Sequence, residues 1–504
     1  MNSRASWAGA ALAVGAMGMA IPGTSEAATY QVINKLDSGT GSLRDAVALA
    51  NANPGPDTIT FGPRVSGTIT LTTGEIVVSD SVNIVGPGSK KKVTVSGNDA
   101  SRIFDIPYVY TTLDITISGL TLTHGAANDG GAIYQSGNNL TLNSVQLLSN
   151  RSSDDGGGLW SDGNTTLNNC TISGNTCDND GGGIAADGTL VMDKTVVSGN
   201  MAGDEGGGVY LYDPDSTVIT CSTISGNFCD SDGAGIYFYD TDGEVLIQDT
   251  VISGNFAGDD GGGVFFYDAS DDITFTRCTI SGNTANACGG GIYFYDADSD
   301  VTVTIDRSTI SGNKANEDGG GIFIDDDARL ALTVVNTTIS GNTALGDGGG
   351  VFFDYLNSNG ASFNFCTIAG NSGDNGGGIY SNTGYYGGAV SIQNSIIGDN
   401  TAWSDPDVSG SGFVLSYSLV ENTGSAGYTD NGGNLLGIDP KLMALASNGG
   451  STKTMLLKTG SPALNVADPA VVSPATDQRG QARVKDGRAD MGAVEMDAPK
   501  KKKR

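Results

Sequence analysis

The chain has 504 residues, 77 glycines and a formal net charge of −30, and only 7% of its residues are aromatic. A surface this acidic repels phosphate, and no basic stripe is present to neutralise it. These numbers exclude nucleic acid and anionic membrane surfaces as partners, and they are typical of a soluble, self-repelling particle.

Residues 1–27 are predicted to be a secretory signal peptide. Arg4 provides the positive end, Trp7–Ile21 the apolar stretch, and Ser25-Glu26-Ala27 a small-x-small cleavage site. The alternative is an uncleaved anchor helix, for which the apolar run is short against the roughly 20 residues that a span requires. No other membrane segment is apparent, so we expect a secreted or outer cell-surface protein without a transmembrane segment after signal removal.

Residues 28–91 are expected to form an N-terminal cap and the first irregular coils. Ser42 is a candidate N-cap for a short helix over residues 43–50, which Asn53-Pro54 ends. A helix laid over the first coil would bury open strand edges that otherwise invite aggregation. Coils begin with Asp57–Phe61 and become regular at Lys92–Asn98.

Residues 92–425 repeat one unit, in which a phrase such as Thr171-Ile172-Ser173-Gly174-Asn175 is followed by Gly181-Gly182-Gly183-Ile184. A steady period of about 25–30 residues indicates a solenoid. The runs between turns are short and β-rich, without helical periodicity. They predict an all-β parallel β-helix of about 13 coils stacked roughly 4.8 Å apart. The closing asparagines are expected to form an amide ladder: Asn150, Asn175, Asn200, Asn227, Asn255, Asn283, Asn313, Asn342, Asn371 and Asn400. The glycines fit a turn that needs positive φ or close backbone approach.

An aromatic column follows the glycine phrase. Its position holds an aromatic residue in nine of ten coils, and alternation along the strand predicts that it points outward. These residues are Tyr134, Trp160, Ala185, Tyr210, Tyr237, Phe265, Tyr293, Phe323, Phe352 and Tyr380. Two positions later come Tyr212, Tyr239, Tyr267 and Tyr295, followed by Asp213, Asp240, Asp268 and Asp296. Rings flanked by carboxylates suit a carbohydrate chain. The predicted ligand-binding face comprises Tyr210, Tyr237, Phe265 and Tyr293, together with the four tyrosines and four aspartates just named. The alternative is that the rings only stabilise the sheet, by about 0.2–1 kcal/mol per pair.

An acidic column precedes the glycines. At about 4.8 Å, neighbouring carboxylates repel by roughly 1 kcal/mol in water and about 3 kcal/mol at an effective dielectric constant of 20. Such a row predicts bound cations, Ca²⁺ being the oxygen-seeking candidate. The predicted metal ligands are Asp155, Asp180, Glu205, Asp232, Asp260, Asp318 and Asp347. The alternative is a solvated edge whose carboxylates cap turn N–H groups.

The seven cysteines are interpreted as small buried thiols rather than disulfides. Cys170, Cys278 and Cys366 share one column but lie in coils that are not adjacent, so they cannot pair with one another. Pairs within one coil, such as Cys170 with Cys177, remain the alternative.

Residues 426–495 lose the repeat and are expected to be a C-terminal cap, and residues 496–504 a solvated basic tail. The Gly-Gly-x-(Ile/Val) and Asn phrases resemble the repeats of polymorphic outer membrane proteins, which are β-helical passenger domains used in adhesion. This resemblance implies a right-handed coil. The segments Asp439-Pro440-Lys441-Leu442, Gly460-Ser461-Pro462-Ala463, Asp477-Gln478-Arg479-Gly480 and Asp490–Glu495 are similar to the choice-of-anchor Q domain. That similarity implies a secreted or surface protein.

The sequence therefore favours adhesion or glycan binding through a repetitive aromatic and acidic face, with an extracellular polysaccharide or cell-surface glycan as partner. The first alternative is a polysaccharide lyase or glycoside hydrolase acting along the same face, and the second is a structural spacer. No local cluster that breaks the repeat is evident as a catalytic site, and His124 stands alone. We therefore assign no catalytic residue, and Ca²⁺ is the only cofactor considered.

Overall fold

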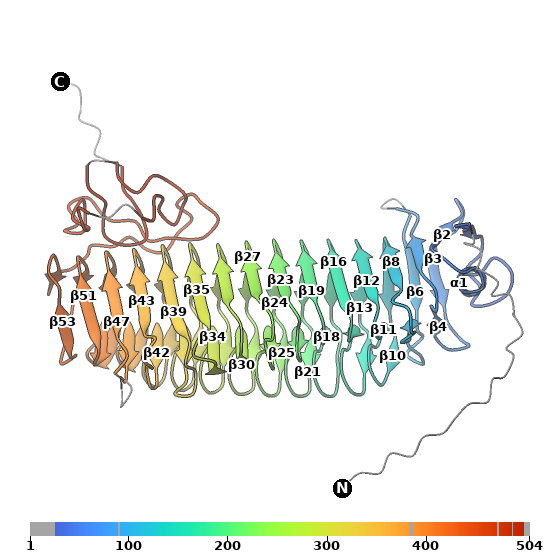
Figure 1. Ribbon diagram of the computed structural model, residues 1–504, viewed down its shortest axis with the longest axis horizontal. Coiled ribbons are helices and arrows are strands. Elements are labelled where there is room, and N and C mark those ends of the chain that lie inside the picture. Colours follow the sequence, from blue (N-terminus) through green and yellow to red (C-terminus); the bar gives the residue numbers. More distant parts are fainter. Residues whose placement is uncertain (1–25, 89–90, 384–386, 471–472, 486, 498–504) are drawn as a thin grey trace, which may run out of the picture.

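The computed structural model describes residues 26–88, 91–383, 387–470, 473–485 and 487–497. Most of the predicted signal peptide and of the basic tail lies outside these ranges. The described chain forms a long parallel β-solenoid with strands stacked coil over coil (Figure 1). None of its helices in these ranges is long and apolar enough to cross a bilayer.

One coil illustrates the repeat. The strand β22 (Val209–Leu211) belongs to a 13-stranded sheet, β23 (Thr217–Thr220) to a 16-stranded sheet and β24 (Thr223–Ser225) to a 15-stranded sheet. The two-residue strand β25 (Phe228–Cys229) joins an eight-stranded sheet before the glycine turn. The chain then enters β26 (Ile236–Phe238), which pairs in parallel with β22 one coil earlier. All pairings between the named strands are parallel and in register, as the period predicts.

The amide ladder is confirmed at every predicted asparagine. Asn255 is typical: its Oδ1 accepts from both the backbone N–H and the Nδ2 of Asn227, each at 3.0 Å. Its own Nδ2 donates to Asn283 Oδ1 at 2.9 Å and to the Ile224 carbonyl at 3.2 Å. These side chains are buried, so the ladder satisfies polar groups that would otherwise lack partners inside the solenoid.

The glycine turn combines both of the predicted requirements. Gly233 has φ of +65°, and a Cβ on Gly235 would lie 2.2 Å from the carbonyl oxygen of Gly263 in the next coil. Only glycine allows coils to stack this closely at the turn.

The N-terminal end is covered as expected. Helix α1 (Leu43–Asn51) starts at Ser42, whose side chain accepts from the Asp45 backbone N–H at 3.1 Å. Its buried face, which includes Leu43 and Val47, packs against β1 (Thr29–Val32) and β2 (Asp57–Phe61). The helix lies at the end of the solenoid (Figure 1).

The C-terminal segment lies along the side of the last coils. The solenoid itself ends at β53 (Tyr428–Asp430) and β54 (Leu435–Leu436), while the following residues fold back over earlier coils (Figure 1). Gln478 Nε2 donates to the Ser308 carbonyl at 2.8 Å, and the Ala493 N–H donates to Thr367 Oγ1 at 3.0 Å. The segment therefore shields a flank of the solenoid, and its suggested kinship with an anchor domain stays a prediction.

Within the described residues all seven cysteines are free thiols, and the predicted burial holds for five of them. Five are buried, Cys221 is exposed and Cys288 is half-buried.

Candidate functional site: a gap in an aromatic ladder

The aromatic column forms an inner ladder on the outer side of the 13-stranded sheet. Its strands include β15 (Leu159–Ser161), β18 (Ile184–Ala186), β22, β26, β30 (Val264–Ala269) and β34 (Ile292–Ala297). Neighbouring rings stack in register, for example Tyr210 on Tyr237 with centroids 5.3 Å apart and Tyr237 on Phe265 at 5.1 Å. The ladder is a cluster separate from the solenoid core. The predicted outward direction is therefore correct.

The expectation that these rings are presented to solvent is wrong. Tyr210, Tyr237, Phe265 and Tyr293 are only 1–8% exposed. The glycine turn explains this, because a Cβ on Gly233 would lie 2.7 Å from the Tyr237 Cβ. Without side chains, the turn folds closely against the base of the ring. Tyr237, Phe265 and Tyr293 also have a ring on each side, whereas Tyr210 has a ring only on the Tyr237 side. These four residues stabilise the sheet and do not form an open binding surface.

The second predicted row forms an exposed outer ladder. Tyr212, Tyr239, Tyr267 and Tyr295 are 51%, 37%, 39% and 38% exposed. Successive rings stack with centroids 5.0–5.2 Å apart. The predicted carboxylates follow directly in sequence, with Asp213 exposed and Asp240, Asp268 and Asp296 half-buried. Stacking hides the ring faces, so this ladder offers mainly ring edges and hydroxyl groups to solvent.

The inner ladder is interrupted at one coil, and the outer ladder begins in the coil that follows. Ala185 pairs with Trp160 on one side and with Tyr210 on the other, so a methyl group stands where the other coils have a ring. A pocket of about 270 Å³ opens at this point. We call it the ring gap, and its lining residues are Asp155, Trp160, Asp180, Ala185, Ala186, Asp187, Tyr210 and Tyr212.

The ring gap is where ring faces become accessible. The far face of Trp160 is covered by Tyr134, with centroids 4.6 Å apart and planes within 4°. The far faces of Tyr210 and Tyr212 are covered by Tyr237 and Tyr239. All three residues line the gap on the other side, where Tyr212 is 51% exposed and Tyr210 only 8%. Ala185 itself is only 3% exposed, so the pocket lies above its methyl group, at the level of the rings.

Burial raises the pKa values of the acidic residues that line the ring gap. Desolvation raises the pKa of Asp180 to about 6, opposed by the hydrogen bond from the Glu205 N–H and reinforced by the Asp155 charge. Desolvation also raises the pKa of Asp155 and that of Asp187, the latter with a contribution from Asp213. Two of these acids were predicted as metal ligands, whereas Trp160, Ala185 and Asp187 were not assigned to the site from sequence.

Carboxylates of the acidic column accept hydrogen bonds from backbone N–H groups of the turns, as the alternative to metal binding predicts. Asp155 Oδ1 accepts from the Asp180 N–H at 3.1 Å and Asp180 Oδ1 from the Glu205 N–H at 3.0 Å. Asp232, Asp260, Asp318 and Asp347 each accept likewise from the next coil, at 2.8, 2.6, 2.5 and 2.9 Å. One oxygen of each of these carboxylates thus satisfies a turn N–H.

Ca²⁺ binding stays a prediction. Of the predicted ligands in the described chain, only Asp155 belongs to a group of acids with close ligand atoms, lying within 4.8 Å of oxygens of Asp129 and Asp154. Both other groups of this kind, Asp325 with Asp326 and Asp354, and Asp399 with Glu421 and Asp439, lie outside the column.

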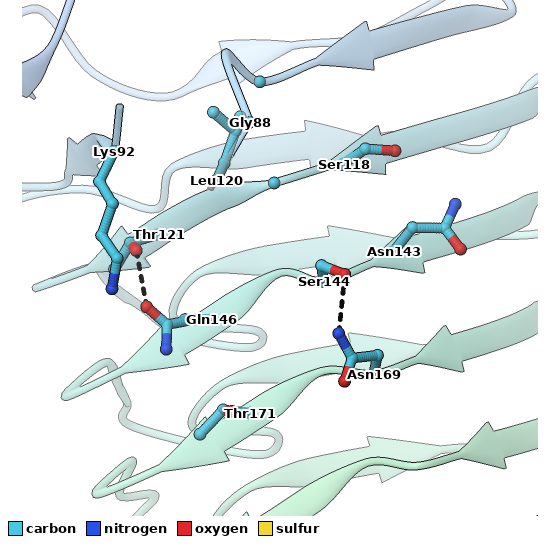
Figure 2. A pocket seen from close by; sticks show the side chains of 12 residues that line it. Gly88, Lys92, Ser118, Leu120, Thr121, Asn143, Ser144, Gln146, Asn169 and Thr171 are labelled. Atoms are coloured by element: carbon cyan, nitrogen blue, oxygen red, sulfur yellow. Dashed lines mark hydrogen bonds between the residues drawn. The ribbon is translucent and has the colours of Figure 1, made fainter. Parts of the chain in front are cut away.

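A larger polar pocket lies on another face, at the corner between the 16-stranded and 15-stranded sheets. It has a volume of about 600 Å³, and hydroxyl and amide side chains with Lys92 line it. Figure 2 shows Thr121 hydrogen-bonded to Gln146 at 3.1 Å and Asn169 to Ser144 at 2.9 Å. Aromatic residues are absent from its lining, so it offers no surface for ring stacking.

A family comparison identifies the architecture. The profile of the right-handed β-helix region matches residues 105–280 and 262–434. The chain belongs to the right-handed β-helix family. The match also confirms the hand that the resemblance implied. No curated protein sequence matches this β-helix.

Two solved structures match this chain at low similarity. The pectate lyase Pel9A is 16% identical with a TM-score of 0.32, over 94% of this chain and 98% of the lyase. The catalytic unit of a GH87 α-1,3-glucanase from Streptomyces thermodiastaticus is 16% identical with a TM-score of 0.33, over 82% of this chain and 72% of that unit. At these scores neither structure informs the chemistry of this β-helix.

Proposed function

We propose that this β-helix binds polysaccharide at the ring gap, with the outer ladder extending the contact surface. The observation that supports this proposal is that three aromatic residues and three carboxylates line one pocket. Sugar rings pack their apolar faces on aromatic rings, and their hydroxyls donate to carboxylate oxygens. A secreted or surface location would bring the site to extracellular glycans.

A glycan array followed by titration calorimetry tests the proposal. Trp160→Ala and Tyr212→Ala each remove a wall of the ring gap, and we expect each to weaken binding of the best array ligand by about tenfold, or roughly 1.4 kcal/mol. Tyr110→Ala is the control, because this fully exposed aromatic is not among the residues that line the pocket. Unchanged binding in both wall variants would favour the spacer interpretation.

A glycoside hydrolase is the second candidate. It is supported by Asp180, whose raised pKa of about 6 suits a general acid, beside the carboxylates of Asp155 and Asp187 in the same pocket. A lyase is disfavoured because none of the eight lining residues is a Lys or Arg that could act as a base. The test is whether the wild type releases reducing ends from a glycan. Release that Asp180→Asn abolishes while binding is retained would establish the hydrolase. If no reducing ends are released, only the binding function is left.

A further inference from the structure

The ring gap has an unusual charge for a sugar site. Asp155, Asp180 and Asp187 line it, and none of its eight residues is basic. The Oδ1 atoms of Asp155 and Asp180 are taken by backbone N–H groups. In the described chain no hydrogen bond is made to the Oδ2 atom of Asp180, which stays available to a ligand. An occupant with a positive charge would compensate carboxylates that the protein leaves without a counter-ion.

The ring walls favour the same kind of occupant. Trp160 and Tyr212 both line the pocket, and Tyr212 is 51% exposed, whereas Tyr210 is only 8% exposed. The Ala185 methyl group stands between the coils of Trp160 and Tyr210, where the other coils have a ring. Aromatic rings attract cations, and indole attracts them most strongly. The pocket therefore combines aromatic surface with attraction for a cationic substituent.

We propose that the ring gap is a subsite for a sugar residue with a free ammonium group, an amino sugar within a glycan chain. The sugar ring packs on Trp160 and Tyr212 above the Ala185 methyl group, and its ammonium group donates to the carboxylates of Asp180 and its neighbours. This inference rests on the proposed polysaccharide binding and specifies the sugar that the gap selects.

Other sugars fit less well. A uronic acid would bring a further negative charge into a pocket with three carboxylates, on a chain with a net charge of −30. A neutral sugar would desolvate the carboxylates without providing a compensating charge. The raised pKa values of Asp155, Asp180 and Asp187 agree with this electrostatic imbalance, since burial and repulsion by neighbouring carboxylates both disfavour their charged forms.

The decisive variant fills the gap. Ala185→Tyr inserts the residue type that the same column holds at Tyr134, Tyr210 and Tyr237, so we expect the ladder to close and the solenoid to fold normally. The melting temperature checks folding. Asp187→Asn removes one carboxylate from the gap, and Asp230→Asn, which neutralises an exposed acid, is its matched control.

The probes are a glucosamine tetrasaccharide and its fully N-acetylated counterpart, titrated at about pH 7, where an amine with a pKa of roughly 7.7–8.0 is mostly protonated. We expect the wild type to bind the free amine at least about tenfold more tightly than the acetylated form, less so at high salt. Ala185→Tyr should abolish this preference, Asp187→Asn should reduce it and Asp230→Asn should retain it.

Three results would overturn the inference: no binding of the amine probe by the wild type, equal binding of the two probes, or unchanged binding in Ala185→Tyr. If Ala185→Tyr binds as the wild type but Trp160→Ala and Tyr212→Ala still lose array ligands, the amino-sugar subsite fails and the polysaccharide function stands. If these three variants all bind every glycan unchanged, both proposals fail.

Discussion

One hydrogen-bond pattern in the acidic column leads to a prediction about stability. Asp260 lies between Asp232 and Cys288 in the column, and its Oδ1 accepts from the Cys288 N–H at 2.6 Å. Desolvation raises its pKa to about 7, and the Asp232 charge adds to the shift, against that hydrogen bond. Asp260→Asn keeps the accepting oxygen and removes the charge. An asparagine already occupies one position of the column. Asn375 donates its Nδ2 to Asp347 Oδ1 at 2.8 Å.

The sign and size of the expected change in stability follow from the linkage between protonation and folding. A carboxyl group whose pKa is raised on folding favours the folded state below about pH 4 and loses that contribution as pH rises through about 7. The rise from 3.8 to about 7 corresponds to about 4 kcal/mol at pH 8. Solvent screening at a partly exposed site reduces this to about 2 kcal/mol. For a chain of this size we expect Asp260→Asn to raise Tm by about 2 °C at pH 8 and by almost nothing near pH 4.

Circular dichroism melts of wild type and variant at several pH values between 4 and 8 measure this difference. Asp230→Asn carries the same charge change at an exposed site and is expected to leave Tm almost unchanged at every pH. A difference between Asp260→Asn and wild type that is constant with pH would refute the electrostatic reasoning. So would a lower Tm of the variant at pH 8, which would mean that the ionised carboxylate stabilises the turn.

Three further predictions concern the solenoid. Asn255→Ala breaks four ladder hydrogen bonds and should lower the free energy of unfolding by about 3–5 kcal/mol in urea melts, whereas Asn164→Ala, at an exposed amide, should cost less than about 1 kcal/mol. If Ca²⁺ binds near Asp155, millimolar Ca²⁺ should raise Tm in the wild type but not in an Asp154→Asn/Asp155→Asn variant; equal melts with Ca²⁺ and with chelator would contradict it. Cys221 is the exposed thiol and should react first with a disulfide reagent in the native protein, so that Cys221→Ser removes the fast phase; a fast phase that persists in this variant would contradict the burial of the other thiols.

The solenoid could be predicted from sequence because each coil repeats the same local rules. The spacing of Asn227 and Asn255 gives the length of a coil, and stacking in register then requires their amides to form a ladder. Ser42 indicated the start of the capping helix, because a side-chain oxygen there satisfies a free N–H. The position of the C-terminal segment was not predictable in this way. Its contacts, such as Gln478 with Ser308, join residues far apart in sequence without any period.

The candidate site was predicted only in part, because alternation along a strand determines direction but not exposure. Tyr237 points away from the core as expected, yet it is 1% exposed because the glycine turn and the neighbouring rings cover it. The signal for the ring gap was present in the sequence: Ala185 is the one position in ten where the column lacks an aromatic residue. Its meaning depends on knowing that stacked rings hide each other's faces, which only the three-dimensional register shows.

The two ends of the outer ladder differ in their surroundings. At one end Tyr212 borders the pocket beside Asp187. At the other end Tyr295 makes an edge contact with Tyr293 of the same strand, whose ring is turned 70° to it with centroids 6.5 Å apart. Tyr293 is held in this orientation by a 2.6 Å hydrogen bond from its hydroxyl to Asp325 Oδ2. Both ends of the tyrosine row are followed by an aspartate in the adjacent coil, but the pocket lies at the end where the inner ladder has Ala185 in place of a ring. The proposed stacking site therefore depends on the interruption of the inner ladder rather than on the number of tyrosines in the outer one.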